Sequence, residues 1–159
     1  MKLRELKISD ANSMLEWMHD ENVVKYMGQN FKSKEIDDCI SFIRDASKSD
    51  VNCHMAIVND FDEYMGTVSL KNINHDTKNA EFAITLSSKA MGKGFSKFGM
   101  FEILKKGLFE FNLDEIYWYV SKENTRAIKF YDKNNCSRRL PKNLSNIDVD
   151  NFIWYTVTK

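Results

Sequence analysis

Residues 79–97 read NAEFAITLSSKAMGKGFSK, and this stretch decides the fold. Apolar side chains alternate along Asn79 to Leu86, which predicts a β-strand with Glu81 on the face opposite its aliphatic row. Gly92 and Gly94 follow, and glycine adopts backbone angles that other residues resist. A helical pattern begins directly after them, so we expect free peptide N–H groups at the positive end of a helix dipole. Such a loop binds phosphate oxygens, although two glycines could also serve only to turn a strand into a helix.

This loop matches neither of the common nucleotide-binding motifs. A dinucleotide-binding loop needs a third glycine at the position of Lys97, and a P-loop needs serine or threonine at the position of Gly94. Lys89 and Lys93 could add positive charge beside a diphosphate. Neither common nucleotide motif is therefore present, and both a diphosphate site and a simple strand-to-helix turn stay open for this loop.

The elements on either side of the loop predict a mixed sheet. A helix is expected from about Phe95 to Phe111, followed by a strand over Glu115–Val120. A strand, helix, strand unit normally connects parallel strands through a right-handed crossover. Upstream, strands over Cys53–Val58 and Met65–Asn72 precede the Asn79–Leu86 strand as an antiparallel meander. The residues expected on the buried side of the long helix are Phe98, Phe101, Leu104, Leu108 and Phe111.

The ends of the chain supply the remaining elements. Lys2–Leu6 predicts a short strand followed by a helix, and Ser33 is expected to cap a second helix. Asn124 is expected to cap the last helix, and Asn151–Thr158 ends the chain as a strand. We therefore predict one α+β domain over residues 1–159 with a central mixed sheet.

The composition excludes several kinds of protein. Basic and acidic residues number 23 each, so no overall field attracts nucleic acid or an anionic membrane. No apolar run approaches the roughly 20 residues that span a bilayer, and the amino terminus lacks the apolar core of a signal peptide. We therefore expect a cytoplasmic protein. The three cysteines show no Cys-x-x-Cys spacing, which predicts reduced thiols and no metal site.

A second motif lies about 30 residues beyond the glycine loop. Asn124 is followed by Ala127 and then by Tyr131, directly after the strand that ends at Val120. This chain resembles the GCN5-related N-acetyltransferases, whose signatures are Gln/Arg-x-x-Gly-x-Gly/Ala before a long helix and Asn-x-x-Ala with a tyrosine four residues on. Lys89 stands where that family usually has glutamine or arginine. Both motifs occur in the expected order, and the resemblance covers nearly the whole chain.

The resemblance implies both a fold and a cofactor. The expected sheet is twisted and mostly antiparallel, with helices on both faces and a splayed parallel strand pair at the site of acyl-CoA. Acetyl-CoA is the implied co-substrate, with its pantetheine arm along the strand before the loop and its diphosphate on the loop amides. The residues expected to contact it are Thr85, Leu86, Ser87, Met91, Gly92, Lys93, Gly94, Phe95, Ser96 and Asn124.

The implied reaction is direct attack of a primary amine on the thioester. A backbone N–H near Ile84 to Leu86 would stabilise the charge that develops on the carbonyl oxygen. Tyr131 is the expected general acid, because a phenol with a pKa of about 10 stays protonated at neutral pH. Glu81 is the expected general base, although it could equally attract a cationic acceptor or pair with a lysine. Asn124 could hold the cofactor arm, cap its helix, or do both.

The acceptor is suggested by residues 15–27, which are similar to the first-helix region of two branches of the family. One branch acetylates amino sugars carried on nucleotides, and the other acetylates protein amino termini, ribosomal ones above all. The short chain leans toward the amino-sugar branch, and polyamines and antibiotics stay open. The expected acceptor contacts are Trp17, His19, Tyr26 and Met27, with core packing as the alternative for Trp17.

The sequence also leaves open a non-catalytic role and an oligomeric state. A regulatory protein that binds acyl-CoA without turnover is the alternative of another class, although Glu81, Asn124 and Tyr131 speak against it. The family often pairs subunits through its last strands or its acceptor side, so the oligomeric state stays open with a homodimer preferred.

Overall fold

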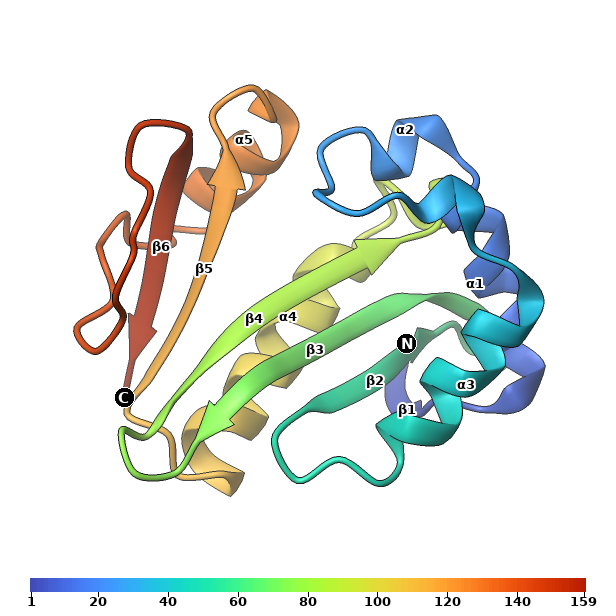
Figure 1. Ribbon diagram of the computed structural model, residues 1–159, viewed down its shortest axis with the longest axis horizontal. Helices are drawn as coiled ribbons and strands as arrows, with labels where there is room; N and C mark the ends of the chain where they lie inside the picture. The colour runs from blue at the N-terminus through green and yellow to red at the C-terminus, as the bar shows by residue number, and fades with distance from the viewer.

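The computed structural model describes residues 1–159 as a six-stranded sheet with helices on both faces (Figure 1). The strands lie in the order β1-β2-β3-β4-β5-β6, and all neighbours are antiparallel except the parallel β4–β5 pair. They are β1 Lys2–Glu5, β2 Cys53–Val58, β3 Tyr64–Asn74, β4 Asn79–Leu86, β5 Glu115–Ser121 and β6 Phe152–Thr158. The mixed, mostly antiparallel sheet predicted from the sequence is confirmed.

Three helices lie between β1 and β2, one lies between β4 and β5, and one lies between β5 and β6. They are α1 Ala11–Met18, α2 Glu21–Val24, α3 Ile36–Ala46, α4 Phe95–Lys105 and α5 Thr125–Lys133. Short 3₁₀ turns lie at Ile8–Asp10, Phe31–Ser33 and Ser88–Ala90, and a wider π-helical turn over Lys106–Glu110 extends α4. The helix predicted from about Phe95 to Phe111 therefore corresponds to α4 and this turn together.

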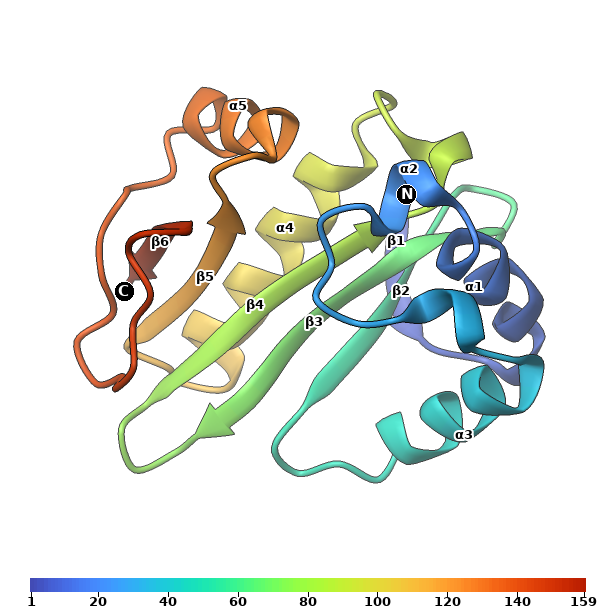
Figure 2. The same cartoon turned by 45° about the horizontal axis from the view of Figure 1, so that its top comes forward.

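Two apolar cores lie on opposite faces of the sheet. Helix α4 crosses one face, where Met100 and Ile103 are fully buried in a cluster with Leu70 and Phe82 (Figures 1 and 2). Helices α1 and α3 cover the other face over β2 and β3. The residues of that second core are Ala11, Met14, Trp17, Met18, Val24, Cys39, Ile43, Ala56, Val58 and Tyr64. This second layer leaves the β5 and β6 end of the sheet uncovered on its side (Figure 1).

Two local predictions are wrong. Phe101 is 48% exposed, because the buried face of α4 runs through Gly99, Met100 and Ile103 and turns Phe101 toward solvent. Ser33 does not cap α3, since it belongs to the preceding 3₁₀ turn. Glu35 is the N-cap residue of α3 instead, and its N–H donates to Oδ2 of Asp38 at 2.8 Å.

The outer edge of β6 is covered by the chain itself. The N–H of Arg139 donates to the carbonyl of Trp154 at 3.1 Å, and the N–H of Thr156 donates to the carbonyl of Ser137 at 3.0 Å. The hydroxyl of Thr156 also donates to the carbonyl of Arg139 at 2.6 Å. The segment 137–139 therefore pairs with the middle of the terminal strand although it is not itself a regular strand.

Candidate active site

The loop before α4 leaves a run of backbone donors unused. None of the amide N–H groups from Gly92 to Lys97 donates to another group of the protein, whereas the N–H of Phe98 donates to the carbonyl of Gly94 at 3.1 Å. Free N–H groups at the start of an eleven-residue helix, at the positive end of its dipole, form an anion site.

The two glycines give this loop its conformation. Gly92 has φ of +75° and Gly94, the N-cap of α4, has φ of +86°, both in the left-handed region that favours glycine. A Cβ at Gly92 would meet no atom within 4 Å, so the backbone there is open to a ligand. The hydroxyl of Ser87, which lies 5% exposed just before the loop, has no hydrogen-bond partner. A diphosphate with an adjoining polar arm fits these unused groups.

Strands β4 and β5 separate where the cofactor arm is expected. Their pairing covers only Asn79–Glu81 against Glu115–Tyr117. The N–H of Ser87 donates to the carbonyl of Met65 at 2.9 Å, which fixes the hydrogen-bonding alternation along β3 and β4. By that alternation Thr85 also pairs with β3, while the peptide groups of Ile84 and Leu86 point toward β5 beyond the end of the ladder.

This alternation shows which of the predicted contact residues on β4 have a backbone amide available to a ligand. The amide of Leu86 is free to bind a ligand, and so is that of Ile84. The amides of Thr85 and Ser87 are used by β3, so Ser87 offers its side-chain hydroxyl instead.

Tyr131 lies in α5 at the back of this splayed region. It is 7% exposed, and its ring lies 5.3 Å from that of Trp118 and 5.2 Å from that of Tyr155, centroid to centroid. Its hydroxyl makes no hydrogen bond within the protein. Burial raises the pKa of Tyr131 well above its ordinary value, and the neighbouring Cys136 and Tyr155 add to the effect. The phenol is therefore held in the protonated form that a general acid requires.

Asn124 fixes the start of the same helix. Its Oδ1 accepts a hydrogen bond from the N–H of Ala127 at 3.1 Å, as the capping prediction requires. The cap leaves the side-chain NH₂ of Asn124 without a partner in the protein, so a second role toward a ligand is compatible with it.

Glu81 lies on the opposite face of the sheet from Tyr131. Tyr131 packs against Phe82, whose side chain points to the α4 face, and adjacent strand residues alternate between faces. One oxygen of Glu81 lies 2.7 Å from Nζ of Lys71, and the other accepts from Nδ2 of Asn72 at 3.4 Å. Of the predicted alternatives for Glu81, the structure shows the pairing with a lysine.

A cavity of about 340 Å³ lies beside Glu81 between the sheet and the helices α1 and α3. Its floor comes from β2, β3 and β4, and its roof comes from α1, the loop before α3, and α3. Its lining comprises Met14, Trp17, Met18, Gln29, Phe31, Lys34, Asp38, Ser41, Phe42, His54, Thr67, Ser69, Lys71, Ala83, Ile84 and Thr85. Because it reaches Ile84 and Thr85, it adjoins the point where β4 leaves β5.

Only one of the four predicted acceptor residues lines this cavity. Trp17 does, and its Nε1 donates to the hydroxyl of Tyr64 at 3.0 Å, so it also belongs to the core. His19 is exposed and bonds the carbonyl of Lys34 at 2.9 Å. Tyr26 is 39% exposed, and Met27 packs against the second core.

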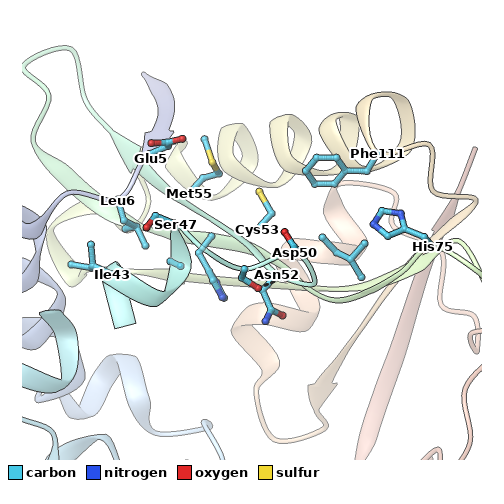
Figure 3. A pocket seen from close by; sticks show the side chains of 14 residues that line it. Glu5, Leu6, Ile43, Ser47, Asp50, Asn52, Cys53, Met55, His75 and Phe111 are labelled. Carbon is cyan, nitrogen blue, oxygen red and sulfur yellow. Dashed lines mark hydrogen bonds between the residues drawn. The ribbon is translucent and has the colours of Figure 1, made fainter. Parts of the chain in front are cut away.

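A second cavity, of about 360 Å³, lies away from all predicted site residues (Figure 3). It follows the edge of β2 that β1 leaves unpaired, since β1 ends at Glu5 opposite Met55. Figure 3 shows Cys53 and Met55 at its centre and His75 and Phe111 at one end. It touches neither the glycine loop nor the splayed strands.

No group of three His, Cys, Asp or Glu residues in the structure could hold a metal ion, and all three cysteines are free thiols. None of the helices has the length and apolar character needed to cross a membrane.

Comparison with known proteins identifies the family. The model of the acetyltransferase (GNAT) domain matches residues 1–137. The chain belongs to this family. The acetyltransferase is 30% identical over 132 residues to the uncharacterized N-acetyltransferase p20 of Bacillus licheniformis, which covers 81% of this chain and 74% of that protein. It is 29% identical over 133 residues to the spermidine N(1)-acetyltransferase of Escherichia coli K12, and this match spans 84% of this chain and 70% of that protein.

A solved structure agrees with the fold. The spermidine N-acetyltransferase of Vibrio cholerae, in complex with CoA and spermine, superposes with a TM-score of 0.83 at 19% identity over 99% of this chain and 94% of that one. The predictions of family, fold and acyltransferase activity are confirmed. The relatives with a named acceptor are spermidine acetyltransferases, so the comparisons do not support the predicted leaning to amino-sugar or ribosomal-protein acceptors.

Proposed function

We propose that this acetyltransferase transfers an acetyl group from acetyl-CoA to the primary amine of a small molecule. The observation that carries the proposal is the run of unused amides from Gly92 to Lys97 at the start of α4, next to the unpaired end of β4. These amides would hold the diphosphate of acetyl-CoA, with the hydroxyl of Ser87 and the amide of Leu86 available to the adjoining arm. Acetyl-CoA supplies the activated acetyl group when bound.

The residues at the splay suit direct attack by an amine. A bond forms between the amine nitrogen and the acetyl carbon, the bond from that carbon to sulfur breaks, and the products are an N-acetylated amine and free CoA. The amide of Ile84 or Leu86 would stabilise the charge that develops on the acetyl oxygen. Tyr131 would donate its proton to the departing sulfur. No protein nucleophile is needed.

Glu81 is proposed to take the proton that the attacking ammonium must lose. It lies on the side of β4 that faces the cavity of about 340 Å³, and one of its oxygens pairs with Lys71 at 2.7 Å. An intervening water could carry this proton. The ion pair with Lys71 is also compatible with a role in which Glu81 only attracts a cationic acceptor. The pH profile of a Glu81 variant would distinguish this role from that of a general base.

Three classes of acceptor have an observation in their favour. A polyamine is favoured by the relatives named as spermidine acetyltransferases. An amino sugar carried on a nucleotide is favoured by the resemblance of residues 15–27 to that branch, and a peptide amino terminus by the resemblance to the other. The cavity of about 340 Å³ suits a small molecule better than a protein segment, so we rank the peptide last.

Release of free thiol from acetyl-CoA tests the proposal directly. We expect release that depends on at least one amine in a panel of polyamines, amino sugars and their nucleotides, and amino-terminal peptides. Binding of acetyl-CoA with no release across the panel would favour a non-catalytic sensor and contradict the proposal. A homodimer is also proposed, and light scattering would measure it; the Vibrio cholerae enzyme forms a dodecamer in one of its structures.

A further inference from the structure

The acceptor cavity carries an unpaired positive charge. Of the charged residues that line it, Lys71 is engaged with Glu81 at 2.7 Å. Lys34 is half-buried and has no carboxylate within ion-pair distance. An ammonium without a carboxylate partner at the wall of a cavity is free to form a charge-assisted hydrogen bond with an anionic group of a ligand.

The acidic residue of the lining is already used. Asp38 lies in the first turn of α3, where its Oδ2 accepts from the N–H of Glu35 at 2.8 Å and its charge meets the positive end of the helix dipole. It therefore offers less to a ligand than a free carboxylate would.

The remaining polar groups of the lining are neutral. Burial lowers the pKa of His54, and the charge of Lys71 lowers it further, so its ring is uncharged at neutral pH. Its Nδ1 lies 2.7 Å from the hydroxyl of Ser69. Thr67 and Ser41 supply further hydroxyls that suit a polyhydroxylated or amide-bearing molecule.

Resting on the function proposed above, we infer that the acceptor amine belongs to a molecule that also carries an anionic group, a carboxylate or a phosphate, which Lys34 binds while the amine reaches Thr85. A polyamine would place additional ammonium groups in the same cavity beside the unpaired Lys34, where Asp38 accepts from the Glu35 amide and Glu81 is already paired with Lys71. The names of the relatives do not fix this acceptor, because proteins that share a fold and part of their sequence can differ in the charges that line this cavity.

Matched pairs of amines test this inference. Glucosamine and glucosamine 6-phosphate differ by a phosphate, and β-alaninamide and β-alanine differ by a carboxylate; spermidine is the polycation. We would measure kcat/KM for each from thiol release at saturating acetyl-CoA. We expect the anion-bearing member of at least one pair to exceed its neutral partner by about tenfold or more, as a charge-assisted hydrogen bond provides. The pair that responds tells phosphate from carboxylate.

Three variants assign the effect to Lys34. Lys34→Gln should bring the ratio within the responding pair close to one, and Lys34→Arg should keep it. Lys32→Gln is the matched control, because Lys32 is exposed, pairs with Glu21 at 2.7 Å and does not line the cavity. Thermal unfolding of each variant confirms that it is folded.

The outcomes separate this inference from the proposed function. Higher kcat/KM for spermidine than for every anion-bearing amine would overturn the inference and leave the proposed function standing, as would a ratio that Lys34→Gln does not change. In that case Asp38→Asn, which can still accept from the Glu35 amide, should lower activity on spermidine. No thiol release with any amine would overturn the proposed function and this inference together.

Discussion

Replacing Gly94 with alanine isolates the contribution of the glycine loop. Gly94 has φ of +86°, and a Cβ there would meet only Cε of Met1, at 3.7 Å, which is ordinary contact. No steric clash adds to the effect, so the cost is that of a left-handed backbone with a side chain, about 1–2 kcal/mol. For a chain of this length that lowers the melting temperature by about 2–8 °C.

The same change should weaken acetyl-CoA binding more than it destabilises the fold. Relieving the strain rotates φ and turns the neighbouring amides, and each charge-assisted hydrogen bond lost costs about 1.5–3 kcal/mol. We therefore expect Kd to rise by about tenfold to a hundredfold in a calorimetric titration. Gly94→Asn should be milder, because asparagine tolerates this conformation. The chain itself places asparagine at positive φ at Asn72, Asn112, Asn135 and Asn146.

Gly28→Ala is the matched control. Gly28 lacks a positive φ, and a Cβ there would meet nothing within 4 Å, so the substitution should leave both stability and cofactor affinity nearly unchanged. If Gly94→Ala were as stable as Gly28→Ala and bound acetyl-CoA as tightly as the unmodified chain, the loop could not be the diphosphate site.

Three further outcomes are expected. Tyr131→Phe removes a hydroxyl without a protein partner, so turnover should fall by about a hundredfold or more in the thiol-release assay while the melting temperature and acetyl-CoA affinity stay nearly constant; unchanged turnover would exclude Tyr131 as the acid. Glu81→Gln breaks a partly exposed pair with Lys71, so unfolding free energy should change by less than about 1 kcal/mol while turnover falls most at low pH; a pH profile that only scales uniformly would leave Glu81 no role as base. Gly66→Ala drives a Cβ into the carbonyl oxygen of Thr85, so it should destabilise by about 1–3 kcal/mol in denaturant unfolding, and a neutral effect would contradict the close β3–β4 approach.

Much of the fold could be predicted because its signals are local. The alternation along Asn79–Leu86, the two glycines and the cap at Asn124 each involve residues close in sequence, and the structure places strand, loop and helix accordingly. The stripe of α4 was misread at Phe101 because the glycine at position 99 carries no apolar side chain, although its backbone faces the core.

The proposed acceptor cavity could not be predicted in the same way. Its lining joins residues 29–42, His54 and the middle of β3, which no short-range pattern connects. Lys34 and Lys71 look like ordinary surface lysines in the sequence, and only the packing of α3 over β3 brings both to one cavity. Tyr26, in contrast, is an aromatic residue of the kind that often contacts ligands, but it does not line the cavity.

The self-paired edge of β6 limits how copies of this chain could assemble. Because the segment 137–139 occupies the hydrogen-bonding groups around Trp154 and Thr156, a strand from a neighbouring molecule could join there only after displacing it. Continuous growth of the sheet from one molecule into the next is therefore blocked on this side. An oligomer would have to associate through another part of the surface, and its copies could then separate without breaking this backbone pairing.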